Sequence, residues 1–490
     1  MRQLREERTR ATTYALGAFV VIGAVARLWK LGAAPLNFDE SYTAMVGRLP
    51  LGEVFGFLRA HDSHPPLDYL LQLPLARLGA SAFVFRLPSA ICSILALALF
   101  AWWMRNRGIV GVAATAAMSL CAFQLTYGRE ARMYGPMELI GVGAAVAADS
   151  WLRAPRRRHA VIIGAITFVG LLTHVSMLLA AIGLVALAGR RLDREAWRWR
   201  AGIAAGTAGW AMLWGPSFVT QSHGGHSSWI PHTTPARLVN TIGALVAARP
   251  ALSLIIFATI VAGSVICLRT DRHQAAVLVC CFVIPVTLAA LIGMRAPVLL
   301  NRTLTVVAWG PLLAIGYAID FATRRARPLG VAATALAALM LVGSVPATLR
   351  TGGPTAALVE LERVARAGDV VAIQPATKAV ELYWTLAVRS DDGPARSVQL
   401  PELPGTVAVA LTGHRPSGRL WLMQYTNRKI DLAGYQLCAR TWQHGQTRML
   451  CLRKRHPSEL AYGPPPSIKT PFEQLVSTRA PASATAAGRP

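Results

Sequence analysis

The sequence predicts an α-helical polytopic membrane protein with a small C-terminal α/β domain outside the membrane. Hydrophobic residues make up 53% of the 490 residues and charged residues only 15%, whereas a soluble chain carries charge at about a quarter of its positions. The apolar residues lie in long runs, and short clusters of arginine separate these runs. This alternation is typical of membrane-spanning helices joined by basic loops.

The formal net charge of +26 could also indicate a nucleic-acid-binding protein. We reject that class, because the arginines recur between apolar runs instead of forming one stripe. The positive-inside rule accounts for this spacing, so the predicted partner is membrane lipid and not nucleic acid. The first run has no small-residue cleavage site before Asn37 and many runs follow it, so we expect a retained span and not a cleaved signal peptide.

About eleven transmembrane helices are predicted. They cover residues 12–30, 83–104, 109–127, 135–152, two short spans within 160–189, 201–219, 250–268, 275–294, 303–321 and 329–346. The short basic N-terminus is placed in the cytoplasm, which puts nearly every arginine cluster on the cytoplasmic side. If 160–189 were one span, without the turn at Thr173 and His174, the predicted membrane orientation of every later segment would be inverted.

The external segments hold further short helices. The first external loop covers residues 31–82, and its Leu67–Leu78 stretch is too short to span, so it is placed along the interface. A second interfacial helix is expected at 236–248. The multi-pass chain is therefore assigned to the cytoplasmic (inner) membrane of a bacterium, with its C-terminus outside the cytoplasm.

We expect three domains: a transmembrane domain over 1–346, an extracytoplasmic α/β domain over 347–460, and a disordered tail over 461–490 that is rich in Pro, Ser, Thr and Ala. Alternating helices and apolar strands favour the α/β assignment. The predicted strands are 369–373, 407–411 and 419–423, and the predicted helices are 356–367 and 377–388.

Two of the seven cysteines, Cys438 and Cys451, lie in this C-terminal domain and flank a predicted hairpin. A disulfide is consistent with a location outside the cytoplasm, and two reduced, buried thiols remain the alternative. The other cysteines lie in apolar segments, where a free thiol behaves as a small hydrophobe. None of the spacings fits a metal site.

Two ionisable motifs lie just outside the bilayer on the external side. The first contains Asp39 and Glu40, and the second contains His61, Asp62 and His64. Such groups are costly beside lipid and indicate a functional site. The simpler alternatives are that Asp39 caps the next helix, that Glu40 pairs with an arginine, and that His64 snorkels toward water.

Arginines at external span ends form a second group of candidates: Arg129, Arg132 and Arg302. The planar guanidinium suits a phosphate group, although ordinary headgroup anchoring would also place arginines there. Tyr134 follows Arg132 and could donate a hydrogen bond to phosphate or belong to an interfacial aromatic belt.

These residues, in this order, resemble the polyprenyl-phosphate-dependent glycosyltransferases of the GT-C superfamily, related to protein O-mannosyltransferases and lipid A aminoarabinose transferases. The similar elements are Phe38–Tyr42, His64–Tyr69, Phe85–Ser89, Arg129–Tyr134 and Arg302. The ordered set covers roughly residues 12–345 and is more specific than any one motif. Tyr42 and His64 depart from the pattern, because aminoarabinose transferases often have Arg and Lys at these places.

The resemblance implies a fold and a mechanism. The fold is GT-C-like, and Asp39 is the implied base, with Glu40 as a second catalytic carboxylate. His64, Arg129, Arg132, Tyr134 and Arg302 are the implied ligands of the lipid phosphate and sugar. A base on the side of the sugar opposite the phosphate would invert the anomeric centre.

The sequence gives no certain cofactor and leaves metal dependence open, since a divalent cation, Mg²⁺ or Mn²⁺, could be held by Asp39 and His64. His223, His226 and His232 could be interpreted as a zinc site, but no Cys or carboxylate completes one. We interpret their loop instead as a cover over the pocket, with Trp229 stacking on sugar or lipid.

The sequence thus predicts a transfer of mannose or arabinose from a polyprenyl-phosphate donor to an envelope glycan, lipid or protein acceptor on the external face. Two alternatives remain. A transporter or flippase for a lipid-linked sugar would place charges at mid-membrane and often has inverted repeats. A non-catalytic envelope scaffold would leave Asp39, His64 and Arg132 without a role.

Overall fold

A computed structural model gives the structure of the chain and divides it into two compact units, each of which is described by itself. The first unit is Met1–Leu31, Phe55–Asp68 and Arg86–Arg350, and the second is Gly32–Val54, Tyr69–Phe85 and Thr351–Pro490. The structure describes residues 2–34, 36–78, 81–189, 191–223, 230–247, 250–296, 298–326, 328, 330–331, 360–361, 363–364, 369–374, 396–399, 407–410, 419–424, 435–438, 442–444, 447–454 and 461–462. The domain boundary predicted near residue 347 lies outside these residues and stays a prediction.

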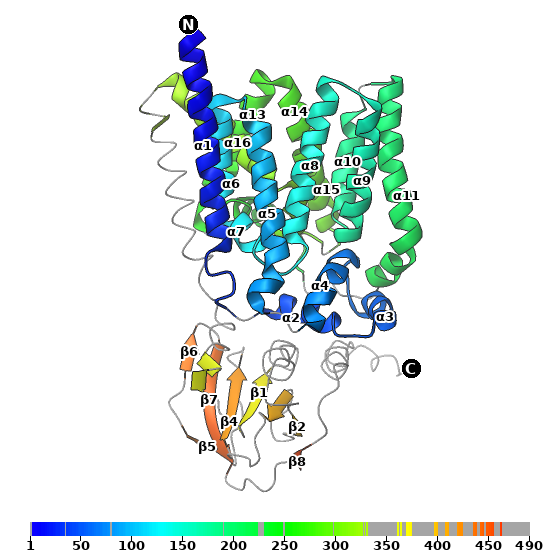
Figure 1. Ribbon diagram of the computed structural model, residues 1–490, viewed down its shortest axis with the longest axis vertical. Coiled ribbons are helices and arrows are strands. Elements are labelled where there is room, and N and C mark those ends of the chain that lie inside the picture. Colours follow the sequence, from blue (N-terminus) through cyan, green and yellow to red (C-terminus); the bar gives the residue numbers. More distant parts are fainter. Residues whose placement is uncertain are drawn as a thin grey trace, which may run out of the picture. The chain divides into compact units, whose positions relative to one another are not determined.

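Helices almost wholly within the first unit form an apolar bundle (Figure 1). They are α1 (Arg2–Leu28), α5 (Ala82–Met104), α6 (Gly108–Leu120), α7 (Ala122–Tyr127), α8 (Tyr134–Arg153), α9 (Arg157–Thr173), α10 (Met177–Leu187), α11 (Arg194–His223), α12 (Pro235–Ala244), η1 (Pro250–Leu252), α13 (Ser253–Thr270), α14 (Arg272–Leu278), η2 (Val279–Val283), α15 (Ile284–Gly293), η3 (Arg302–Val307) and α16 (Trp309–Arg325). Stretches long and apolar enough to cross a membrane by themselves are Arg10–Leu28, Ala82–Met104, Pro250–Thr270 and Arg272–Gly293. The predicted helical membrane fold is therefore confirmed, while the span expected at 329–346 lies almost wholly outside the described residues.

The stretch 160–189 forms two helices joined by a three-residue turn, as the sequence predicted. At the start of α9, His159 hydrogen-bonds Ser150 near the end of α8. Just beyond the end of α10, Arg191 lies over the ring of Trp151, also near the end of α8, with 5.6 Å between guanidinium carbon and ring centroid. The start of α9 and the end of α10 therefore lie at the same end of the bundle. The pair is a hairpin, with its turn between Thr173 and Met177.

The third predicted span is broken where α6 ends and α7 begins. Cys121, at the break, has a non-helical ψ of 124°, which frees carbonyl groups in the last turn of α6. The buried guanidinium of Arg27 on α1 donates to the carbonyls of Met118 and Ser119, each at 3.2 Å. Since lipid offers no hydrogen bonds, such a break requires partners from neighbouring helices.

The same guanidinium begins a buried network through four helices. Arg27 Nε donates to Ser93 Oγ at 2.7 Å, and Ser93 Oγ donates to Glu138 on α8. The side-chain amide of Gln124 on α7 lies against Glu138, and its nitrogen can donate to both carboxyl oxygens when the amide is flipped. The side chains of Arg27 and Glu138 in the bundle interior are thus bridged by the hydroxyl of Ser93.

The second unit includes short helices from the segment between α1 and α5. These are α2 (Phe38–Val46), with α3 (Leu51–His61) and α4 (Leu67–Arg77) shared between the units. The α4 helix matches the predicted interfacial segment 67–78, and α12 in the first unit matches the one at 236–248. Gly47 fits closely against α4, because a Cβ there would lie 2.6 Å from the Cβ of Ala76.

The C-terminal part of the second unit contains an eight-stranded sheet in the order β5-β7-β4-β1-β3-β2-β8, with β6 also paired to β7. Its strands are β1 (Val370–Gln374), β2 (Arg396–Gln399), β3 (Val407–Ala410), β4 (Arg419–Gln424), β5 (Tyr435–Leu437), β6 (Trp442–His444), β7 (Thr447–Lys454) and β8 (Ala461–Tyr462). Strands β1 and β4 pair in parallel and the other neighbours are antiparallel. All three predicted strands are present, whereas the predicted helices 356–367 and 377–388 lie mostly or wholly outside the described residues.

Two side-chain links hold this sheet together. Buried Asp369 accepts two hydrogen bonds from Arg419 at 2.9 and 3.0 Å and a third from the indole of Trp421 at 2.9 Å. Cys438 and Cys451 form a disulfide between the end of β5 and β7. The alternative of two reduced thiols is therefore wrong in this structure.

Candidate active site

The first motif is held by a capping box at the start of α2. Asn37 Oδ1 accepts from the backbone N–H of Glu40 at 2.9 Å, and Glu40 Oε2 accepts from the backbone N–H of Asn37 at 2.8 Å. The cap is thus Asn37, so the alternative interpretation of Asp39 as the cap is wrong. Glu40 is fully buried, whereas Asp39 is half-buried in the first turn, and a carboxylate there is favoured by the helix dipole.

The second motif forms a tight turn around Asp62. One oxygen of this buried carboxylate accepts from the backbone N–H groups of Ser63 and His64 at 2.6 and 3.1 Å. The same oxygen contacts Nδ1 of the His64 ring at 2.8 Å. The turn is followed by buried Pro65 and Pro66, so the backbone and ring of His64 are both fixed. The structure does not describe the side chain of His61.

A second histidine, His174, occupies the turn between α9 and α10. Its ring centroid lies 5.5 Å from that of His64. The backbone N–H of Ser176 donates to His174 Nδ1 at 3.0 Å, so this nitrogen is an acceptor and the proton of the neutral ring is on Nε2. Burial lowers the pKa of His174 to about 3, and His64, Arg132 and Arg302 act in the same direction. His174 is therefore a neutral hydrogen-bond donor.

Asp68 and two arginines complete the group. Asp68, in the first turn of α4, interacts electrostatically with Arg132 and Asp62, and His174 interacts with Arg132 and Arg302. Burial raises the pKa of Asp68 to about 6, while Arg132 opposes the shift. We call Asp62, His64, Asp68, Arg132, His174 and Arg302 the polar cluster.

Three of the predicted ligands, His64, Arg132 and Arg302, thus lie in one cluster that comes from distant parts of the sequence. The carbonyl of Arg132 accepts from Ser89 Oγ at 3.2 Å, and the same hydroxyl accepts from the backbone of Gly135. The Phe85–Ser89 motif therefore fixes the loop that carries Arg132. Arg302 begins η3, where Asn301 caps its backbone N–H.

Other predicted residues have different surroundings. Arg129 donates to the carbonyl of Trp29, beyond the end of α1, at 2.6 Å, which is a typical structural contact. Tyr134 is 2% exposed and packs edge-on against Tyr127, with ring centroids 5.0 Å apart. It therefore lies inside the bundle and does not belong to a lipid-facing aromatic belt.

Among the described residues, no group of three or more His, Cys, Asp or Glu side chains has a geometry that could hold a metal ion. Asp39 and His64, the predicted cation ligands, belong to different units, which are described separately. His223 and His232 are described, but His226 and Trp229 lie outside the described residues. The predicted cover over the pocket stays a prediction.

Sequence reasoning gave no role to Asp68 or His174 and missed the pairing of Arg27 with Glu138. His174 could have been singled out, because a lone histidine at the turn of an apolar hairpin is costly without a task. Asp68 lies within the His64–Tyr69 motif, which was recognised by Pro65 and Pro66 and not by its carboxylate. The partner of Arg27 could not be found, since no sequence spacing relates α1 to α8.

No protein-family model matches the chain, and no curated protein matches it. Among solved structures, ArnT, the lipid A aminoarabinose transferase, from Cupriavidus metallidurans is similar in its form bound to undecaprenyl phosphate. The TM-score is 0.54 at 14% identity, covering 89% of this chain and 97% of that chain. The apo form gives 0.53 at 15% identity, covering 90% and 98%.

An apo oligosaccharyltransferase from Archaeoglobus fulgidus shows a weaker likeness. The TM-score is 0.45 at 11% identity, with 69% of this chain and 55% of that chain covered. The likeness to ArnT extends over nearly the whole of both chains. The chain therefore shares its fold with ArnT.

Proposed function

We propose that the protein is a membrane glycosyltransferase that moves a sugar from a polyprenyl-phosphate donor to an acceptor outside the cytoplasmic membrane. The observation that carries this proposal is the polar cluster, because it gathers two arginines and two histidines at one end of an apolar bundle. An anionic headgroup attached to a long apolar chain matches both properties. The ArnT structure, with the same fold, is bound to undecaprenyl phosphate, the kind of lipid such a donor would release.

The cluster supplies groups that suit a leaving phosphate. Arg132 and Arg302 carry fixed positive charge, and neutral His174 can donate from Nε2. Buried donors of this kind stabilise the negative charge that develops on the phosphate oxygen as the bond to the sugar breaks. Asp62 and Asp68 limit the net charge, so the site is not a purely cationic surface.

Asp39 is the proposed base. It would take the proton of the acceptor hydroxyl while the hydroxyl oxygen attacks the anomeric carbon, and the lipid phosphate would leave with the electron pair of the broken C–O bond. Attack from the side opposite the phosphate inverts the anomeric centre. The capping box of Asn37 and Glu40 fixes the first turn of α2, in which Asp39 lies.

The finer assignments rest on the sequence. Mannose and arabinose are the favoured sugars, and an envelope glycan, lipid or protein is the acceptor. The protein would lie in a bacterial inner membrane with the N-terminus in the cytoplasm and the C-terminal sheet outside. A Mg²⁺ or Mn²⁺ ion is an optional addition to this mechanism.

The test uses purified full-length protein in detergent with radiolabelled polyprenyl-phosphate mannose or polyprenyl-phosphate arabinose. Release of free polyprenyl phosphate is followed for the wild type, Asp39→Asn and the control Glu53→Gln, an exposed carboxylate in the first turn of α3. We expect release from one donor that Asp39→Asn abolishes and Glu53→Gln retains. Parallel reactions with EDTA or added Mn²⁺ report the need for a cation.

An active Asp39→Asn variant would refute the base assignment. Binding of both donors without release from either would count against these two sugars. Movement of the labelled donor between the leaflets of a vesicle without cleavage would support the flippase alternative.

A further inference from the structure

A cavity of about 500 Å³ lies at the end of the bundle opposite the polar cluster. It is formed by the turn between α5 and α6, the last turns of α8, and the junction of α13 and α14. The α8 helix has 20 residues from Tyr134 to Arg153, so the cavity and the polar cluster are about 30 Å apart along its axis. The cavity is therefore a separate site.

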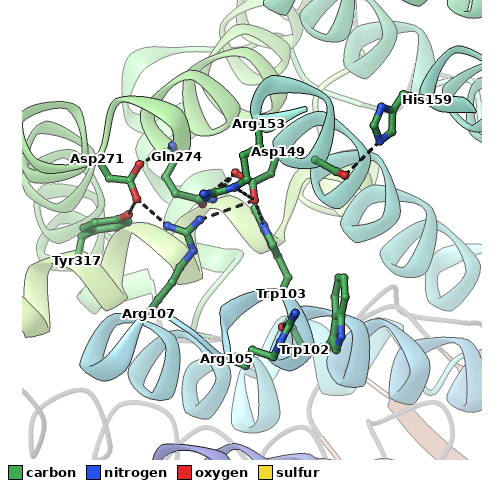
Figure 2. A network of polar contacts seen from close by, with 11 residues as sticks. Trp102, Trp103, Arg105, Arg107, Asp149, Arg153, His159, Asp271, Gln274 and Tyr317 are labelled. Atoms are coloured by element: carbon green, nitrogen blue, oxygen red, sulfur yellow. Dashed lines mark hydrogen bonds and ion pairs between the residues drawn. The ribbon is translucent and has the colours of Figure 1, made fainter. Parts of the chain in front are cut away.

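Asp149 lines the cavity and is the centre of a network of polar contacts (Figure 2). Its carboxylate accepts from the indole of Trp103 at 3.0 Å, from the amide of Gln274 at 3.0 Å and twice from Arg153 at 3.1 and 3.2 Å. It is 6% exposed. All of its acceptor capacity is used by the protein, so Asp149 positions its neighbours and does not repel an anion as a bare carboxylate would.

Arg107 is held in the same way by a second carboxylate. It donates to Asp271 at 2.7 Å and lies 3.8 Å from Asp149. Asp271 also accepts from the hydroxyl of Tyr317 at 3.3 Å and caps α14 through the backbone of Gln274. Such a network gives Arg107 a fixed orientation in the wall.

Arg105 is a third arginine of the cavity wall, and it does not contact Asp149 or Asp271. It is exposed, donates to the carbonyl of Trp102, and lies 4.3 Å above the Trp102 ring. Among the described residues it forms no ion pair. The three arginines that line the cavity, Arg105, Arg107 and Arg153, exceed the two aspartates by one positive charge.

An apolar stripe on α5 leads to this cavity. Ile91, Leu95 and Trp102 are spaced as one helix face and are 46%, 50% and 53% exposed. Trp102 belongs both to the stripe and to the cavity wall. A soluble phosphate would use the arginines but not the stripe, whereas a lipid would use both.

We propose that this cavity binds the phosphate headgroup of an anionic membrane lipid, with an acyl chain along the Ile91–Leu95–Trp102 stripe. Arg105 and Arg107 would meet the phosphate oxygens, and Trp102 would lie at the boundary between headgroup and chain. Basic cavities between transmembrane helices are suited to lipid headgroups. The site is independent of the proposed transferase activity.

The test is native mass spectrometry of the full-length protein in detergent, titrated with dioleoylphosphatidylglycerol, dioleoylphosphatidylcholine or inorganic phosphate. We expect saturable binding of phosphatidylglycerol that is tighter than that of phosphatidylcholine. Arg105→Gln should raise its apparent Kd about tenfold, because a charge-assisted hydrogen bond is lost. Arg105→Lys should retain most of the affinity. Trp102→Ala should weaken binding of phosphatidylglycerol.

The control is Arg269→Gln, an exposed arginine in the last turn of α13 that does not line the cavity. Equal losses in Arg105→Gln and Arg269→Gln would overturn the proposal, since they would indicate general attraction to a basic surface. Equal affinity for the two lipids would also overturn it. Displacement of phosphatidylglycerol by inorganic phosphate at equal concentration would assign the cavity to a free phosphate.

Discussion

Asp62 and His64 are joined by a 2.8 Å hydrogen bond between one carboxylate oxygen and ring Nδ1. Because the carboxylate accepts, Nδ1 carries a proton, and Nε2 is the atom that remains for a ligand. At the neighbouring His174 the arrangement is reversed, since Nδ1 accepts from Ser176. Nδ1 is thus used locally in both rings, whose centroids are 5.5 Å apart, but as a donor in His64 and as an acceptor in His174.

Removing the carboxylate at position 62 should loosen the His64 ring. We expect Asp62→Asn to weaken binding of polyprenyl phosphate about tenfold, because the charge-assisted bond to Nδ1 is lost. Binding is measured by equilibrium titration of the purified protein. Ser63→Ala is the control, because it keeps the backbone donor to Asp62; a similar loss in that variant would contradict a specific role for Asp62.

Glu40 can be tested for catalysis and for capping by two substitutions. A glutamine can take the place of glutamate in a capping box, so Glu40→Gln should keep both fold and activity if the residue only caps. Glu40→Ala should cost about 1 kcal/mol of stability, measured by thermal unfolding in detergent. Loss of activity in a stable Glu40→Gln variant would instead indicate a catalytic carboxylate.

Asp68 should give lipid binding a pH dependence. Burial raises the pKa of Asp68 above the ordinary carboxyl value, to about 6, so the neutral form is favoured on folding and the charge is gained as pH rises through 6. Neutralising Asp68 makes the polar cluster more cationic, so acidification from pH 7.5 to 5.5 should tighten binding relative to Asp68→Asn.

The measurement is the ratio of the two dissociation constants for polyprenyl phosphate at each pH. The titrations of the lipid phosphate and of the other side chains are largely common to both proteins and cancel in this ratio. The ratio, wild type over Asp68→Asn, should fall toward one below pH 6. A ratio that stays constant from pH 5 to 8 would show that Asp68 does not titrate in this range.

Arg129 and Arg132, in the loop between α7 and α8, should not be equivalent. Arg132→Gln should weaken polyprenyl phosphate binding about tenfold or more, because a guanidinium that faces the phosphate is lost. Arg129→Gln is the matched control from the same loop, since the Arg129 guanidinium contacts the carbonyl of Trp29. This substitution should lower thermal stability with little change in affinity. A larger loss of affinity in Arg129→Gln than in Arg132→Gln would assign phosphate binding to Arg129 instead.

The disulfide allows the location of the sheet to be tested in cells. Cys438 and Cys451 should resist a maleimide–polyethylene glycol reagent in denatured whole membranes until a reductant is added, as expected for a domain outside the cytoplasm. The five free cysteines, Cys92, Cys121, Cys267, Cys280 and Cys281, are labelled in both proteins. A Cys438→Ser variant frees the thiol of Cys451 and should therefore gain one further gel shift without reductant. Labelling of the wild type at both positions before reduction would place the domain in a reducing compartment.

The sequence was sufficient for the bundle, because arginine clusters and apolar runs repeat along the chain and are local signals. The hairpin of α9 and α10 was predictable from length. The stretch 160–189 is long enough for two short spans, and Thr173 and His174 mark the turn between them. The three strands in the C-terminal part were predictable from short apolar runs bounded by polar residues.

The polar cluster could be predicted only in part. Motif order identified His64, Arg132 and Arg302, but Asp68 and His174 gain their roles from burial and from neighbours distant in sequence. The assignment of Glu40 to the capping box needed the backbone geometry at Asn37. Arg27 resembles a snorkelling arginine in the sequence, because it lies near the end of an apolar span and its partners are carbonyls of another helix.

The contact of Arg27 with the broken span bears on how the chain is assembled in the membrane. The α6 helix leaves two carbonyls without partners of its own, and α1 is synthesised earlier and supplies them. An α6 segment released alone into lipid would carry an energetic penalty for those groups. The first span, α1, and the third span, which begins with α6, should therefore enter the bilayer as a pair. This requires α1 to stay bound to the insertion machinery until α6 has been synthesised.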